Sequence, residues 1–235
     1  MPHCQLYLIS PLDVSGQFPD QLARALDAGP VAAFQFRVKG FDEHEAAELA
    51  KPLQEICAAK EVAFIVNDSV SLAKRIGADG VHLGQQDDDV REARERLGKE
   101  AQIGVTCHGS RHLALEAAEA GADYVAFGAF YPTTTKEVSY EAKPALLRWW
   151  HVWAELPSVA IGGITLANAA PLIEAGADFL AVSAGVWQHP EGPGAAVAEF
   201  GKLVQQHRAF DPRLADLAAI MEDLGEPELG MPGEG

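Results

Sequence analysis

Three copies of Gly-Ala-Asp constrain the fold of this chain more than any other feature. The copies begin at Gly77, Gly121 and Gly176, and each leads into a short apolar run without alternation. Each glycine follows a stretch with helical periodicity, and each apolar run is typical of a strand buried on both faces. The repeated unit is therefore a helix, a tight turn and a buried parallel strand. Ligands of such folds bind at the carboxyl ends of the strands, so the residues that follow each run are candidates for function.

Apolar runs and periodic stretches predict eight strands that alternate with helices. We expect strands near residues 4–9, 31–37, 62–66, 79–83, 102–106, 123–127, 158–161 and 178–183. Helical patterns between them include residues 43–60, 88–97, 110–120, 144–154, 166–175 and 194–207. This order predicts an α/β fold of the (β/α)8 TIM-barrel class. An open doubly wound sheet is the alternative, but no Gly-x-Gly-x-x-Gly loop follows the first predicted strand.

Length and composition predict one domain with a short acidic extension. The chain has 235 residues, of which 48% are hydrophobic, enough to bury a large core. We expect the barrel domain to span residues 1–208. Residues 209–235 hold seven acidic residues and one basic residue, and are predicted to be an acidic C-terminal extension. Residues 211–224 could form one helix, and the rest has the composition of a solvated, disordered segment.

The charge balance limits the partners of the chain. A formal net charge of −16 argues against nucleic acid and against anionic membranes, because both are bound through Lys and Arg. No apolar stretch is long enough to cross a bilayer, and the N-terminus lacks a signal segment, so we expect a cytoplasmic protein. Three cysteines in no Cys-x-x-Cys spacing indicate reduced thiols. Small phosphorylated molecules remain as expected partners, and a homo-oligomer is left open.

A basic cluster ends the second predicted strand. Gln35, Arg37 and Lys39 alternate along it, so a strand would place all three on one face. A guanidinium and an ammonium that converge at the top of a barrel suit a polyanion such as a diphosphate. The alternative is a charged strand end that faces solvent.

Two carboxylates follow neighbouring predicted strands. Asp68 comes after the third strand and Asp87 after the fourth, so the two could share a cation. Mg²⁺ takes one or two carboxylates and completes its octahedron with water and phosphate oxygens. The alternative is that each aspartate caps the helix that follows it.

Three further loops carry groups suited to phosphate. The loop after the sixth strand contains Thr133, Thr134, Thr135 and Lys136, which offer hydroxyl donors and a point charge. Gly163 and Ser183 follow the seventh and eighth strands, where many TIM barrels bind phosphate on backbone amides. A surface turn and close packing of glycines are the structural alternatives. Thr106 can offer a hydroxyl from the fifth strand, whereas its neighbours Cys107 and His108 point to opposite faces and are poor candidates for a nucleophile and its base.

The set of motifs as a whole resembles the thiamine phosphate synthase family. The resemblance spans nearly all of residues 5–188 and rests on these segments in order: Gln35-Phe36-Arg37-Val38-Lys39, Asn67-Asp68, Gly84-Gln85-Gln86-Asp87, Gly104-Val105-Thr106, Tyr131-Pro132-Thr133-Thr134-Thr135-Lys136, Gly162-Gly163 and Val182-Ser183. The resemblance implies a transferase that joins the pyrimidine methylene of hydroxymethylpyrimidine diphosphate to the nitrogen of hydroxyethylthiazole phosphate. Pyrophosphate would leave first, and catalysis would be mainly electrostatic.

The resemblance also implies a role for each matching residue. Arg37, Lys39 and Lys136 would be catalytic. The pyrimidine diphosphate would contact Gln35, Phe36, Arg37, Val38, Lys39, Asn67, Thr106 and Lys136. The thiazole phosphate would contact Thr133, Thr134, Thr135, Gly163, Val182 and Ser183. Asp68 and Asp87 would hold Mg²⁺ as the cofactor.

Two other functions use the same barrel. A thiazole tautomerase would bind thiazole phosphate and isomerise it, and it needs a general base instead of a diphosphate site. A non-catalytic thiamine-phosphate binding protein would keep the barrel without turnover. Because a tautomerase has no leaving group to neutralise, the set of Arg37, Lys39, Asp68, Asp87 and Lys136 favours the synthase.

Overall fold

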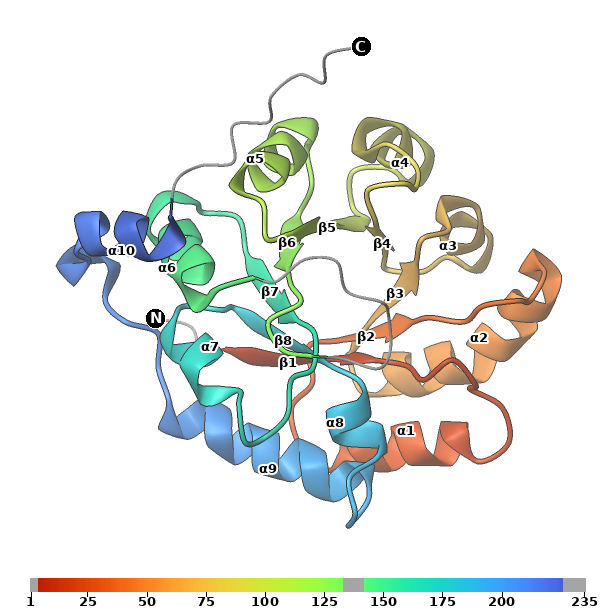
Figure 1. The fold of residues 1–235 in the computed structure, drawn as a ribbon. Coiled ribbons are helices and arrows are strands. Elements are labelled where there is room, and N and C mark those ends of the chain that lie inside the picture. Colours follow the sequence, from red (N-terminus) through yellow and green to blue (C-terminus); the bar gives the residue numbers. More distant parts are fainter. Residues whose placement is uncertain (1–3, 133–141, 226–235) are drawn as a thin grey trace.

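Eight parallel strands close into a barrel in chain order, and β1 pairs with β8 to complete it (Figure 1). The computed structural model describes residues 4–132 and 142–225. The strands are β1 (Gln5–Ile9), β2 (Ala33–Phe36), β3 (Ala63–Asn67), β4 (Gly80–Leu83), β5 (Gln102–His108), β6 (Tyr124–Phe127), β7 (Ser158–Ile161) and β8 (Phe179–Val182). The predicted TIM barrel is confirmed, and the doubly wound sheet is excluded because its edges would stay open.

Helices surround the barrel and connect its strands (Figure 1). They are α1 (Phe18–Asp27), α2 (Glu43–Ala59), α3 (Val70–Ile76), α4 (Val90–Leu97), α5 (Arg111–Ala120), α6 (Pro144–Trp153), α7 (Ala170–Glu174), α8 (Ala184–Trp187), α9 (Pro193–Gln206) and α10 (Leu217–Leu224). Helices α1 and α3 fill the places that the predicted alternation of strands and helices requires, although no range was given for them, and α8 is an additional short helix. Within the described residues, no helix is both long enough and apolar enough to span a membrane.

The aspartates of the three repeats join pairs of strands at the amino end of the barrel. Asp79, before β4, accepts a hydrogen bond from the Phe64 backbone N–H of β3 at 2.7 Å. Asp123 accepts from Ile103 N of β5 at 2.7 Å, and Asp178 accepts from Ser158 N of β7 at 2.8 Å. Each repeat therefore fastens its own strand to the preceding one. The aspartates satisfy buried backbone donors and lie far from the carboxyl ends of the strands.

The core has two layers separated by the strands. The larger layer lies between strands and helices and includes Phe34, Phe64 and Trp150, each fully buried. The smaller one fills the barrel interior, and Tyr7 and Tyr124 are its largest members. Gly104 is required opposite Tyr124, because a Cβ at that position would overlap the tyrosine ring. The interior of the barrel is therefore packed, and ligands must bind above it.

Part of the acidic extension packs on the outside of the barrel. A 3-10 turn (Pro212–Leu214) precedes α10, which lies against α6 (Figure 1). Ile220 is buried there, and the Lys143 ammonium donates to the Asp223 carbonyl at 3.3 Å. A helix within residues 211–224 is present, whereas the boundary between residues 208 and 209 stays a prediction. Residues 226–235 lie outside the described part of the chain.

Candidate active site

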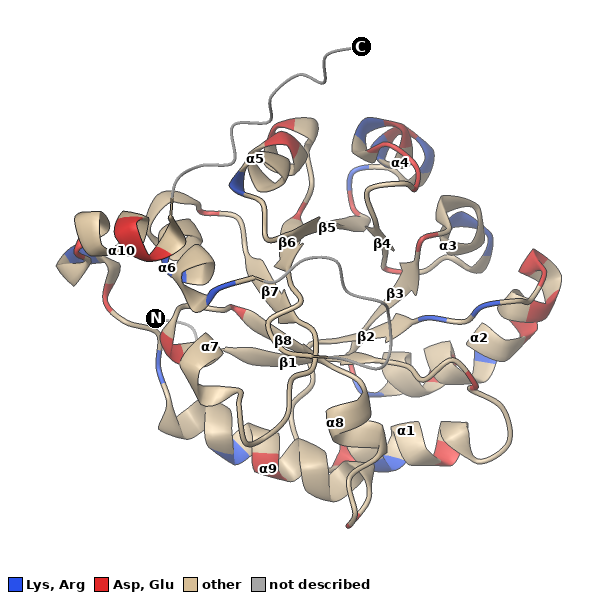
Figure 2. Cartoon of the chain, in the orientation of Figure 1, with Lys and Arg blue, Asp and Glu red and all other residues tan. Residues whose placement is uncertain are grey.

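Arg37 follows β2 at the carboxyl end of the barrel, and its backbone is fixed by a buried serine. The Ser10 hydroxyl accepts a hydrogen bond from Arg37 N at 2.9 Å and donates to Arg37 O at 3.1 Å. In Figure 2 the segment between β2 and α2 carries basic residues. Within the described residues, the Arg37 Nη1 atom is buried and has no hydrogen-bond partner. A buried guanidinium nitrogen without an acceptor is costly, so this arrangement favours an anionic ligand.

Neither Asp68 nor Asp87 caps a helix. Helix α3 is capped by Ser69, whose hydroxyl accepts from Leu72 N, and α4 is capped by Asp89, which accepts from Arg91 N. Asp68 lies at φ 65°, a conformation that few residues other than glycine adopt. Asp87 accepts a hydrogen bond from Gly84 N at 2.7 Å. The capping alternative is therefore excluded for both aspartates.

The carboxyl groups of Asp68 and Asp87 interact with each other electrostatically. Desolvation and the charge of Asp87 raise the pKa of Asp68 to about 6, while Lys39 and Arg37 act in the opposite direction. Two carboxylates held together in this way suit a shared cation. No cluster of three or more His, Cys, Asp or Glu ligands is found in the part of the chain that the structure describes. Two carboxylates are nonetheless sufficient for Mg²⁺ when phosphate oxygens and water fill the other positions.

Below Arg37, a chain of hydrogen bonds crosses the barrel interior. Gln35 Nε2 donates to the Tyr7 hydroxyl at 3.0 Å, and that hydroxyl lies 3.0 Å from the hydroxyl of Tyr124. His82 Nδ1 lies 3.1 Å from the Tyr124 hydroxyl, and its Nε2 lies 2.8 Å from Thr106 Oγ1. The network links Gln35 and Thr106, both of which were predicted to contact the pyrimidine diphosphate. Tyr7, His82 and Tyr124 were not among the predicted site residues.

The other residues predicted for the diphosphate side lie in different surroundings. Asn67 is half-buried at the last position of β3 and pairs in register with His82. Phe36 faces the helices, where its ring stacks on Phe64 at 5.8 Å between centroids. Val38 packs against the same outer core. Any contact of Phe36 with a ligand would therefore come from its backbone, and the predicted contacts of all three residues stay predictions.

The residues predicted for the thiazole phosphate belong to two adjoining turns. Gly163, after β7, has φ 62°, and Ser183 follows β8. A Cβ on Gly185 would lie 2.6 Å from the Ile164 carbonyl oxygen, so the two turns are in contact. The buried Val182 side chain points into the outer core, which leaves its backbone for ligand contact. Thr133, Thr134, Thr135 and Lys136 lie outside the described residues.

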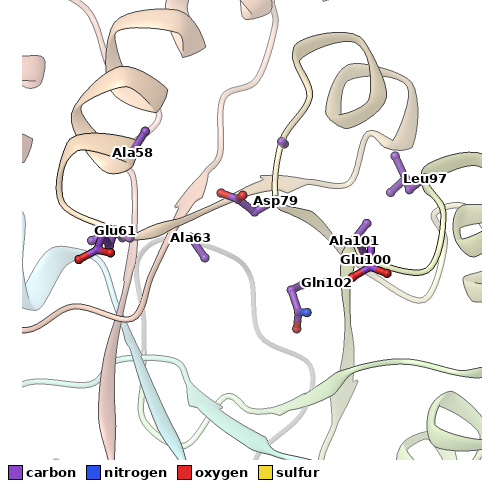
Figure 3. Close-up of a pocket in the computed structure, with 10 residues that line it drawn as sticks. Ala58, Glu61, Ala63, Asp79, Leu97, Glu100, Ala101 and Gln102 are labelled. Carbon is purple, nitrogen blue, oxygen red and sulfur yellow. The ribbon is translucent and has the colours of Figure 1, made fainter.

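A cavity of about 660 Å³ lies at the opposite end of the barrel (Figure 3). Its lining includes Glu61, Asp79, Glu100 and Gln102, which lie near the amino ends of β3, β4 and β5. Asp79 is one of the repeat aspartates and is engaged with the Phe64 backbone. This cavity contains none of the predicted site residues.

Fold and site together define a TIM-barrel protein whose polar groups gather at the carboxyl ends of its strands. The sequence model of the thiamine monophosphate synthase family matches residues 6–186. The chain therefore belongs to the thiamine monophosphate synthase family. The predicted family and the predicted transferase class are confirmed.

Individual relatives agree with this assignment. The chain is 65% identical over 204 residues to the thiamine-phosphate synthase of Erythrobacter litoralis, covering 85% of this chain and 95% of the relative. It is 53% identical to that of Rhodospirillum centenum, with coverage of 87% and 100%. Among solved structures, thiamine phosphate pyrophosphorylase from Pyrococcus furiosus superposes with a TM-score of 0.77 at 31% identity, covering 86% of this chain and 96% of that one.

Proposed function

We propose that this protein is a thiamine-phosphate synthase that transfers the pyrimidine methylene of hydroxymethylpyrimidine diphosphate to the thiazole nitrogen of hydroxyethylthiazole phosphate. The C–O bond to the diphosphate breaks, and its electron pair leaves with pyrophosphate. The nitrogen lone pair of the thiazole forms the new C–N bond. The observation that carries the proposal is the buried Arg37 nitrogen without an acceptor, together with two carboxyl groups whose charges act on each other.

Arg37 and Lys39 hold the diphosphate and stabilise the negative charge that it gains as it leaves. A guanidinium presents a fork of donors to phosphate oxygens, and the fixed backbone of Arg37 means that little reorganisation is needed. Asn67 and Lys136 complete the set as proposed ligands of the same group. Gln35 and Thr106 orient the pyrimidine through the hydrogen-bond network of the barrel interior.

Asp68 and Asp87 would hold Mg²⁺, the proposed cofactor. When bound, the ion would neutralise part of the charge on the diphosphate. The charge that the two carboxylates bring into a diphosphate site would otherwise oppose binding, so the pair is consistent with a cation between them. The phosphate oxygens and carboxylates are hard ligands, which Mg²⁺ prefers.

The thiazole phosphate is proposed to lie on the turns after β7 and β8. Backbone groups of Gly163 and Val182 and the hydroxyl of Ser183 would receive it, together with Thr133, Thr134 and Thr135. Ser183 Oγ lies 3.5 Å from the Ser10 carbonyl oxygen, so Ser10 contacts both Arg37, after β2, and Ser183, after β8. We place the reaction in the cytoplasm, in keeping with three buried free cysteines.

The test supplies both substrates with Mg²⁺ and measures two products. We expect thiamine phosphate and pyrophosphate to form in equal amounts, and neither to form when one substrate is omitted. If the protein instead isomerises thiazole phosphate and forms no thiamine phosphate, it is a thiazole tautomerase and not a synthase. Calorimetric binding of thiamine phosphate without any turnover would indicate the binding protein.

A further inference from the structure

One side chain holds the turn after β7 together. Asn168 Oδ1 accepts a hydrogen bond from Thr165 N at 2.7 Å, and Asn168 Nδ2 donates to the Gly163 carbonyl at 3.0 Å. The amide thus bonds to both ends of the turn. Tyr131, from the segment after β6, donates its hydroxyl to the Asn168 backbone carbonyl at 2.6 Å. These three hydrogen bonds are called the Asn168 clasp below.

The segment after β6 lies directly against this turn. Phe130 N donates to the Ile161 carbonyl and Tyr131 N to the Gly162 carbonyl, both at 3.2 Å. A Cβ on Gly163 would lie 2.8 Å from the Tyr131 carbonyl oxygen, so the close approach requires glycine. The clasp adds a side-chain link between the same two segments. The Tyr131 hydroxyl is protonated at neutral pH, and burial raises its pKa further.

The turn also touches the start of α8. A Cβ on Gly185 would lie 2.6 Å from the Ile164 carbonyl oxygen and 3.5 Å from Thr165 Cα, and both of these residues lie within the turn closed by Asn168. The clasp therefore sets the position of Gly163 relative to the start of α8, which follows β8. Displacement of the turn would change the spacing of backbone groups on both sides of the proposed phosphate site.

We propose that Asn168 and Tyr131 are positioning residues for the phosphate monoester of the thiazole substrate. They hold the Gly163 backbone in its left-handed conformation and act through it, without touching the substrate. This role rests on the proposed function, because the proposed function places the phosphate of the thiazole substrate on the turns after β7 and β8. The diphosphate side, at the ends of β2, β3 and β4, has no hydrogen bond to the clasp among those found in the described residues.

Asn168→Ala and Tyr131→Phe remove the clasp in two steps, and steady-state kinetics with each substrate varied measures the result. We expect Asn168→Ala to raise KM for hydroxyethylthiazole phosphate about tenfold, the effect of a hydrogen bond worth roughly 1.4 kcal/mol, and to leave KM for the pyrimidine diphosphate unchanged. Tyr131→Phe should cause a smaller rise of the same kind. Asn168→Asp keeps an acceptor for Thr165 N but places an oxygen against the Gly163 carbonyl, so we expect it to resemble Asn168→Ala.

Gln54→Ala is the matched control. The Gln54 amide donates to the carbonyls of Ile76 and Gly77 at 3.2 Å each and so holds a turn after α3, remote from the site. Urea unfolding would show comparable losses of stability for Gln54→Ala and Asn168→Ala, and we expect only the latter to change KM. Equal KM values for the thiazole phosphate in wild type and Asn168→Ala, or equal rises for both substrates, would overturn the clasp.

Calorimetric titration with hydroxyethylthiazole phosphate repeats the comparison without turnover. Binding about tenfold weaker in Asn168→Ala than in wild type is the expected result. If the wild type bound the thiazole phosphate but formed no product, the proposed function would fail while the ratio of the two affinities still decided the role of the clasp. Equal affinities of wild type and Asn168→Ala for hydroxyethylthiazole phosphate would reject the positioning role of the clasp, whether or not the enzyme is active.

Discussion

Arg37 shows how a single residue can be prepared for a ligand. Its backbone is held by two hydrogen bonds to Ser10, and one guanidinium nitrogen is buried without an acceptor in the described structure. Such an arrangement opposes folding, since an unsatisfied buried donor costs about 1–3 kcal/mol. A bound phosphate group would supply the missing acceptor and recover that free energy.

Arg37→Lys is expected to lower kcat/KM for the pyrimidine diphosphate about 100-fold, because a lysine cannot reproduce the forked contact with phosphate oxygens. Initial rates of pyrophosphate release measure this effect. Arg75→Lys is the control, since Arg75 pairs with Glu43 at the surface at 3.4 Å. A wild-type rate for Arg37→Lys would remove Arg37 from the mechanism.

Buried cysteines provide a second prediction for individual residues. Burial raises the pKa of Cys57 and of Cys107 to about 12 each, above the ordinary value near 9. At pH 8 the reactive thiolate is therefore a far smaller fraction of each folded thiol than of the unfolded one, because unfolding restores the ordinary pKa. We expect iodoacetamide at pH 8 to label both thiols in urea and neither in native protein over the same time. Rapid native labelling of Cys107, located by mass spectrometry, would contradict its burial.

At the scale of the elements, we expect the aspartates of the Gly-Ala-Asp repeats to stabilise the strand pairs that they join. Asp178 accepts hydrogen bonds from both the backbone N–H and the hydroxyl of Ser158, which is fully buried. Asp178→Ala leaves these donors unsatisfied and should reduce the free energy of unfolding by about 1–3 kcal/mol. Urea unfolding measures the change, and Asp20→Ala on the outer helix α1 should leave stability close to wild type. Equal stabilities for the two variants would show that the repeat does not fasten the strands.

The elements were largely predictable because each strand is an apolar run bounded by polar residues and glycines. The prediction of residues 158–161 matches β7 (Ser158–Ile161), and the prediction of 31–37 encloses β2 (Ala33–Phe36). Roles at the rim were harder to assign. The sequence could not separate a ligand from a cap at Asp68, because the capping Ser69 is its direct neighbour.

The barrel interior was also missed. Tyr7, His82 and Tyr124 lie within or at the start of apolar runs and look like ordinary core residues in the sequence. Only the closure of the barrel brings them from β1, β4 and β6 into one hydrogen-bonded network. Polar residues inside buried strands were the available signal, since a buried polar group requires a partner.

At the scale of the whole molecule, a truncated chain without the acidic extension tests where the catalytic domain ends. Removal of residues 209–235 exposes the surface of α6 that Ile220 covers, so we expect a loss of about 1–3 kcal/mol in the free energy of unfolding. The predicted domain of residues 1–208 contains every proposed ligand residue, so kcat and both KM values should remain those of the full chain. Urea unfolding and steady-state kinetics check the two parts. A loss of activity at temperatures where the truncated chain is folded would place part of the functional unit in the extension.

The central claim is that the rim of the barrel works by neutralising the charge of a departing diphosphate. The dependence of pyrophosphate release on Mg²⁺ concentration, in wild type and in Asp68→Ala and Asp87→Ala, tests it most directly. We predict that EDTA abolishes release in wild type, that added Mg²⁺ restores it, and that each variant needs at least about tenfold more Mg²⁺ for half its maximal rate. A full rate in EDTA, or variants with the Mg²⁺ dependence of wild type, would contradict the account.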